Sequence, residues 1–184
     1  MANSTLVVAG KPKAGGAIWT APLGTALPTD AETELDVAFK SLGFVSDDGL
    51  TNELTTDTEE IKAWGGDTVL TVQTGTSDTF KYKLIEALNI EVLKEVYGAS
   101  NVTGTLETGI KISVNSKEKI EHVIVIETAL RDKLKRIVLP IAKIKEMAEI
   151  TYVDGEPVGY EVTVQALPDA SGNTHYEYIG GTAV

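Results

Sequence analysis

Cysteine is absent from the 184 residues, and histidine occurs only twice. The first absence excludes disulfides, thiolate metal sites and cysteine nucleophiles. No apolar run approaches the roughly 18–20 residues that a membrane-spanning helix needs. The start of the chain also lacks a basic segment followed by an apolar one, so we expect synthesis in a cytoplasm without a signal peptide.

Positive charge is scarce as well. The chain has 16 Lys and Arg against 27 Asp and Glu, which gives a formal net charge of −11. Affinity for nucleic acid comes mostly from basic side chains that neutralise phosphates, so this chain is a poor candidate for gripping DNA, although it could lie beside DNA without binding it. Its length and its 42% hydrophobic content predict one globular domain with a single substantial core.

The residue types that carry catalysis form no recognisable arrangement. His122 and His175 lie in predicted strands, without a serine or carboxylate motif at a familiar spacing. The acidic residues Asp57, Glu59 and Glu60 could together hold a cation, but acidic side chains in loops are usually solvated. We therefore expect no enzyme, no catalytic residue, no cofactor and no metal site.

Residues 65–98 predict a strand, a tight turn, a second strand and a short helix. The turn is expected at residues 74–78, where glycine and short polar side chains gather. The helix is expected at about residues 89–97, with Asn89 as its N-cap and Gly98 just past its end. Because apolar residues also recur at helical spacing from residue 80, one long helix over this region is an alternative.

Further strands are predicted along the rest of the chain. The clearest hairpin joins residues 110–114 to residues 120–127, and a second hairpin turns at Asp154 and Gly155, between residues 147–153 and 158–167. Pro140 predicts a strand end, an edge or a bulge, because proline cannot donate to a strand ladder. The fold class is thus mainly β, with β-sandwich or barrel-like sheets and one short flanking α-helix.

Two segments stand apart from this pattern. Residues 1–34 are rich in glycine and proline and predict an N-terminal arm that folds back on its own domain, docks on a neighbouring subunit or is a disordered tail, leaving residues 35–184 as the domain. Residues 47–64 are acidic and predict a long loop, a kind of connection that is often functional or interfacial. Trp64 is expected either to plug the core or to anchor an interface. The candidate self-assembly residues are Ile18, Trp19, Pro22, Leu23, Leu27, Asp48, Leu50 and Trp64.

Several segments, taken in order, resemble one protein family. They are GAIWTAPLGT at 16–25 followed by Leu27 and Pro28, LGFVSDDG at 42–49, EIKAWGGD at 60–67, LNIEVLKEVYG at 88–98, GYEVT at 159–163 and ALPD at 166–169. Together they resemble the major tail (tail tube) proteins of long, non-contractile-tailed bacteriophages. Each segment is short, and their order along nearly the whole chain carries the resemblance.

The resemblance implies a structural protein of the virion tail, made in the bacterial host cytoplasm. It implies a β-sandwich flanked by one helix, assembled into hexameric rings that stack as a hollow tube. The implied partners are copies of the chain itself, the tape measure protein, and the tail tip (distal tail) and terminator proteins. DNA would pass through the lumen without specific binding, and we expect no membrane binding. We also expect deletion of residues 1–30 to leave a folded monomer that no longer forms tubes.

Two other functions remain open from the sequence. One is another ring-forming tail component, a terminator or a head-to-tail connector, which stacked tubes rather than single rings would exclude. The other is a carbohydrate- or cell-surface-binding β-sandwich accessory protein. Sugar-binding surfaces favour exposed aromatic side chains, and aromatic residues make up only 6% of this chain.

Overall fold

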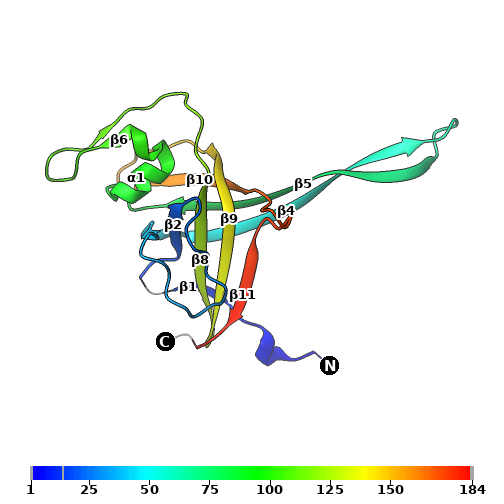
Figure 1. Ribbon diagram of the computed structural model, residues 1–184, viewed down its shortest axis with the longest axis horizontal. Coiled ribbons are helices and arrows are strands. Elements are labelled where there is room, and N and C mark those ends of the chain that lie inside the picture. The colour runs from blue at the N-terminus through cyan, green and yellow to red at the C-terminus, as the bar shows by residue number, and fades with distance from the viewer. Residues whose placement is uncertain (1, 14, 183–184) are drawn as a thin grey trace.

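Strands dominate the computed structural model, which describes residues 2–13 and 15–182 (Figure 1). The main sheet contains β1 (Gly10–Pro12), β2 (Ile18–Pro22), β3 (Lys40–Ser41), β4 (Val45–Lys62), β5 (Thr68–Leu84), β8 (His122–Leu130), β9 (Lys133–Met147), β10 (Tyr160–Ala166) and β11 (Tyr176–Gly180). A small second sheet pairs β6 (Val102–Thr103) with β7 (Lys111–Ile112). The helical elements of the described residues are α1 (Ile90–Tyr97) and the 3₁₀ turns η1 (Ser4–Leu6) and η2 (Ala99–Asn101).

The main sheet is nine-stranded and antiparallel. Its order is β3-β2-β8-β9-β10-β5-β4, with β1 pairing β8 and β11 pairing β9, so the path is open and does not close into a barrel. The predicted mainly-β class with one short flanking helix is confirmed. Near the C-terminus, β11 pairs antiparallel with the first half of β9.

The helix begins and ends where its caps predict. The side chain of Asn89 accepts a hydrogen bond of 3.0 Å from the backbone N–H of Glu91, and Gly98 follows the last turn with a φ of 95°, a conformation that favours glycine. The alternative of one long helix is excluded, because residues 78–84 pair with β10 in β5. Three buried side chains on one side of α1 join the core, Val92, Leu93 and Val96.

Apolar clusters cover both faces of the main sheet. The larger cluster joins side chains of β2, β5, β8, β9 and β10 to those of α1, and Phe80, Ile124 and Leu139 lie at 0% exposure within it. The smaller cluster lies on the opposite face, where Phe39 packs against Val125 and Val138. Because successive side chains of a strand point to opposite faces, neighbouring residues of β9 serve different clusters.

Residues 47–64 do not form the predicted loop. They lie mostly in β4, which pairs with β5 as a long hairpin that projects from the body (Figure 1). The turn predicted at residues 74–78 is wrong for the same reason, since β5 runs through it and the chain reverses at residues 63–67 instead. The first strand predicted after residue 65 is the outer part of β5, but β4 carries no alternation of apolar and polar residues that could reveal it, because both faces of the hairpin are exposed.

Two other predicted pairings are corrected. β7 pairs with β6 and not with β8, because the apolar run of β8 lies inside the sheet between β2 and β9. Residues 148–153 form no strand, and β10 pairs with the C-terminal half of β9, although a turn at Asp154 and Gly155 is present. Of the three alternatives predicted at Pro140, a strand end, an edge or a bulge, the structure shows a bulge, because the register of β8 against β9 shifts beside it.

The N-terminal segment contributes two strands to the main sheet. β1 and β2 both pair with β8, and the side chain of Ile18 is completely buried. Of the alternatives for residues 1–34, this arrangement corresponds to a segment folded back on its own domain. Deletion of residues 1–30 would remove β1, β2 and a core side chain, so from the structure we expect the deleted chain to lose its fold rather than to remain a folded monomer.

Candidate assembly surfaces

The outer part of the β4–β5 hairpin contacts little besides itself. Residues 51–74 are all exposed, and along this length β4 pairs only with β5. Large apolar side chains on it are 41–107% exposed, namely Leu54, Ile61, Trp64, Val69, Leu70 and Val72. A two-stranded ribbon of this kind is marginally stable alone, and exposed apolar residues on a protruding element are typical of an interaction site.

These apolar side chains gather toward the tip. Ile61 lies opposite Leu70, and Glu59 lies opposite Val72. Residues directly opposite each other, and residues two apart on one strand, share a face of a sheet, so Ile61, Leu70 and Val72 form one small apolar face. Trp64 lies in the turn itself with a fully exposed side chain, which excludes its predicted role as a core plug.

The turn at the tip depends on two glycines. Gly65 and Gly66 have φ values of 120° and 100°, which L side chains rarely adopt. The N–H of Ala63 donates to the carbonyl of Asp67 over 2.8 Å and closes the turn. The sequence Trp-Gly-Gly therefore holds the indole at the far end of the hairpin.

A buried carboxylate fixes the base of the hairpin. Asp78 is 1% exposed and accepts hydrogen bonds from Asn52 Nδ2 at 2.8 Å and from Thr174 Oγ1 at 2.6 Å. Its Oδ2 also lies 2.6 Å from Nδ1 of His175. Because three side chains from two distant segments meet on one carboxylate, the hairpin leaves the body in a defined direction.

Both ends of the main sheet are open. β4 pairs only with β5, and β3 pairs only with β2, among the residues that the structure describes. On the side of Asp78 toward the hairpin tip, β5 likewise pairs with β4 alone. Unpaired strand edges attract further strands, so these edges are candidates for pairing with another chain.

The N-terminal segment is held by a buried charge cluster. Arg136, 1% exposed, donates from Nε to Oε1 of Glu127 over 3.1 Å and from Nη1 to the carbonyls of Asp30 and Thr33 over 2.9 Å each. Lys13 Nζ lies 3.0 Å from the same Oε1. The cluster therefore ties the segments around residues 13 and 30 to β8 and β9.

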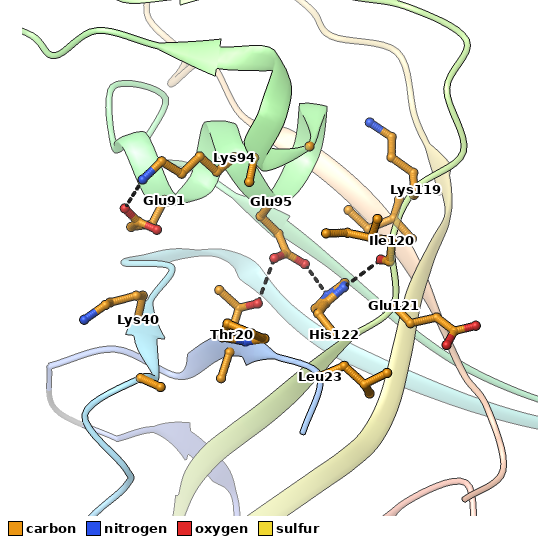
Figure 2. A pocket seen from close by; sticks show the side chains of 16 residues that line it. Thr20, Leu23, Lys40, Glu91, Lys94, Glu95, Lys119, Ile120, Glu121 and His122 are labelled. Atoms are coloured by element: carbon orange, nitrogen blue, oxygen red, sulfur yellow. Dashed lines mark hydrogen bonds and ion pairs between the residues drawn. The ribbon is translucent and has the colours of Figure 1, made fainter. Parts of the chain in front are cut away.

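A cavity of about 400 Å³ lies where α1, β2 and the start of β8 meet. In Figure 2 the side chains of Glu95 and His122 lie side by side at its base, with Nε2 of His122 2.7 Å from Oε1 of Glu95. Glu95 also accepts a hydrogen bond of 2.9 Å from Thr20. Burial disfavours a charged imidazole, but the Glu95 carboxylate and the carbonyl of Ile120 outweigh that effect and raise the pKa of His122 above 6.5.

The structure separates the eight predicted assembly residues into four places. Ile18 is in the core and Trp19 beside it in β2 is half-buried. The exposed residues Pro22 and Leu23 line the cavity, and Leu27 is exposed in the segment that follows. The remaining three belong to the hairpin: Asp48 is exposed near its base, Leu50 packs against the core, and Trp64 is at the tip.

Sequence reasoning missed the buried polar residues. Arg136 is the last of a run of mostly charged residues that begins at Arg131, yet its side chain is buried against Glu127. Asp78 reads as a turn residue and is instead the anchor of the hairpin. For Arg136 the only available signal was its position directly before the apolar run 137–139, which does not identify a partner, and for Asp78 the sequence offered none.

The described residues contain no group of three or more His, Asp or Glu side chains placed to hold a metal ion. No helix among them is long and apolar enough to cross a membrane.

Comparison with known proteins identifies the family. The model of a family described as phage tail tube protein matches residues 1–183. A search of curated proteins found no match.

Among solved structures, the chain is similar to the tube-terminating cap of the anti-feeding prophage, at 11% identity and a TM-score of 0.42, covering 96% of this chain and 98% of the cap. It is also similar to a chain of the sheath–tube complex of the extracellular contractile injection system PVC in its extended state, at 10% identity and a TM-score of 0.40, with 96% and 98% covered. At these TM-scores the two structures carry no argument, and the family match decides the assignment. The chain belongs to the phage tail tube protein family and is a structural component of the tail rather than an enzyme.

Proposed function

We propose that copies of this chain form hexameric rings that stack into the tube of a phage tail. The observation that carries the proposal is the β4–β5 hairpin, which exposes apolar side chains from a body whose own core is complete. An element that protrudes so far without packing on its own domain has its function in contacts with another molecule. In a tube, that molecule is the next copy.

The open edges of the main sheet support closure between subunits. β3 ends the sheet on one side and β4 on the other, so strands of neighbouring copies could pair with these edges and cover them. Suppose each of six copies adds four strands to an inner barrel. A strand spacing of about 4.8 Å and a tilt near 40° give a backbone diameter of roughly 48 Å. Inward side chains then leave a bore of roughly 40 Å, wide enough for a DNA duplex.

The charge of the chain suits a passage for DNA. Each copy has a formal charge of −11, so a ring of six carries roughly 66 negative charges. Like charge repels phosphates, and the genome would slide through the tube to the host without binding the wall. The tape measure protein would occupy the bore before ejection, and tail tip and terminator proteins would cover the two ends.

Electron microscopy of the purified chain tests the proposal. We expect negative-stain images of concentrated protein to show tubes, either spontaneously or after addition of tail-tip complexes that supply a nucleus. Single rings that never stack would instead indicate a terminator or connector. If the protein stays monomeric at every concentration, with and without tips, the proposal is wrong.

A gel-shift measurement tests the passive conduit. Assembled tubes should retain no duplex DNA even at low salt, where electrostatic attraction is strongest. Tight binding that disappears at high salt would show that basic side chains line the bore, and would contradict the proposed repulsion.

A further inference from the structure

We propose that Trp64 of one copy inserts into the cavity beside α1 of a neighbouring copy. The inference rests on the proposed function, since it names the contact through which copies join. The cavity, called the α1 cavity below, is lined by residues of β2, of the segment after β2, of α1 and of the segment before β8.

Trp64 has the features of an interface anchor whose binding site lies on another molecule. Its side chain is 107% exposed, more than any other large apolar side chain of the described residues. Tryptophan carries a large apolar area on a rigid ring and is the residue type that most often dominates binding energy at interfaces. The glycines beside it leave the indole clear of neighbouring side chains, because Gly65 and Gly66 have open space where a Cβ would be.

The α1 cavity fits an aromatic ring in size and chemistry. At about 400 Å³ it is within the range of sites that bury small organic groups. Three of the lining residues are alanines, whose small side chains leave space in the cavity: Ala21, Ala38 and Ala99. Its lining includes Leu23 and Ile120, whose side chains are 50% and 71% exposed (Figure 2). A ring in the cavity would bury both.

Charge at the rim favours the hairpin tip as the occupant. The ammonium groups of Lys40 and Lys119 donate to the backbone carbonyls of Val37 and Val96, at 3.1 and 2.7 Å, and not to carboxylates. Among the other charged residues of the cavity, Lys94 pairs with Glu91 and His122 lies against Glu95, which leaves Glu121 as the opposing charge.

The tip of the hairpin carries a net negative charge, which is complementary to the two lysines at the cavity. It carries Glu59, Glu60 and Asp67 against Lys62. These carboxylates can reach the two rim lysines when Trp64 is seated, and a lysine above the indole face adds cation–π attraction.

The positions of the two partners explain why the contact joins different copies. The hairpin projects to one side of the body, and α1 lies on the opposite side (Figure 1). A residue and its site at opposite ends of one molecule cannot meet within a chain or across a two-fold axis in a closed pair. They make a head-to-tail interface, which continues from copy to copy as a tube requires.

Engineered cysteines test the contact directly, because the chain has none of its own. Ala63→Cys places a thiol beside Trp64, and Ala99→Cys places one at the cavity. An equal mixture of the two variants, assembled and mildly oxidised, should give a disulfide-linked dimer that neither variant gives alone. As a matched control, Ala63→Cys mixed with Ala170→Cys, which is exposed in a distant turn, should give none. No linked dimer in the assembled test mixture, or as much of it in the control mixture, would overturn the inference.

Assembly of side-chain variants gives a second readout. Trp64→Ala and the cavity-filling Ala99→Phe should each raise the protein concentration needed for tubes at least tenfold, while Ala170→Phe leaves it unchanged. Circular dichroism should show all three variants folded. Tubes of both test variants at the wild-type concentration would overturn the inference and leave the proposed function intact. Failure of the wild-type chain to form tubes with tail tips would overturn both.

Discussion

Arg136 and Glu127 form an ion pair inside the protein, with Nε of the arginine 3.1 Å from Oε1 of the glutamate and side chains that are 1% and 5% exposed. They lie opposite each other on β9 and β8. Through Arg136 the pair also holds the carbonyls of Asp30 and Thr33, so it couples the sheet to the segment that links β2 to β3.

Removal of the arginine should be costly. Arg136→Met leaves a buried carboxylate with only Lys13 nearby, and we expect a loss of about 3–5 kcal/mol in the free energy of unfolding, measured by urea denaturation. The double variant Arg136→Met, Glu127→Leu removes the stranded charge and should recover much of that loss. Lys135→Met breaks only the more exposed pair with Glu177 and should cost no more than about 1 kcal/mol. Equal losses in the two single variants would contradict the burial argument.

His122 should make stability depend on pH. Its pKa in the folded chain is raised above 6.5, so its contribution is fully present below that value and is lost as pH rises through the folded pKa. The free energy of unfolding should therefore fall as the pH rises above about 6.5 and through the folded pKa. His122→Gln keeps a donor for Glu95 but does not titrate. The free energy of unfolding of this variant should therefore depend less on pH than that of the wild-type chain. Parallel profiles for the two proteins would show that His122 has no part in the dependence.

Tyr82 offers a variant that should stabilise the protein. Its ring is in the core, its hydroxyl is buried without a hydrogen-bond partner among the described residues, and burial raises the pKa of Tyr82 well above 10. Tyr82→Phe removes the unsatisfied group and keeps the ring, so we expect a gain of about 1 kcal/mol in the free energy of unfolding. Phe80→Leu in the same strand should destabilise and is the control for general repacking. A loss in Tyr82→Phe would reveal a partner for the hydroxyl.

Two N-terminal truncations should differ in their effect on stability, because residues 2–9 are exposed whereas β2 is part of the main sheet. Removal of residues 2–9 takes only exposed side chains and should leave the thermal midpoint within a few degrees of the full chain. Removal of residues 2–30 deletes β2 and the buried Ile18 and should prevent cooperative unfolding altogether. A cooperative transition in the shorter chain would mean that β8 does not need β2 as a neighbour.

Local signals in the sequence were sufficient for the helix and for the kind of fold. Asn89 and Gly98 act on backbone groups within a few residues, so the bounds of α1 follow from the chain itself. Pro140 indicated a local irregularity for the same reason, because the effect of a missing N–H is local, but it did not distinguish a bulge from a strand end or an edge. The resemblance carried by the ordered segments then led to the family that the comparison confirms.

Partners distant in sequence could not be predicted in this way. The pairing of β8 with β2 and β9 was missed because an apolar run predicts burial without saying which strands provide it. The strand β4 and its pairing with the outer part of β5 were missed because both faces of the hairpin are exposed to solvent. The alternation that reveals a strand arises only where one face is buried. Trp64 was noticed from its type and its glycine neighbours, but its position at the end of a ribbon required the three-dimensional structure.

The hairpin also implies that a free subunit and an assembled one differ in rigidity. Residues 51–74 form a ribbon held by a single ladder, with water on every side, so its amide protons should exchange quickly in the monomer even though the body protects its own. Docking on a neighbouring copy would order this ribbon. The conformational entropy lost at that step would oppose the addition of each subunit to the growing end of the tube. Growth would then stay slow in dilute protein and accelerate on a template that already holds the ribbon straight, which gives the cell a means of delaying polymerisation until a starting platform exists.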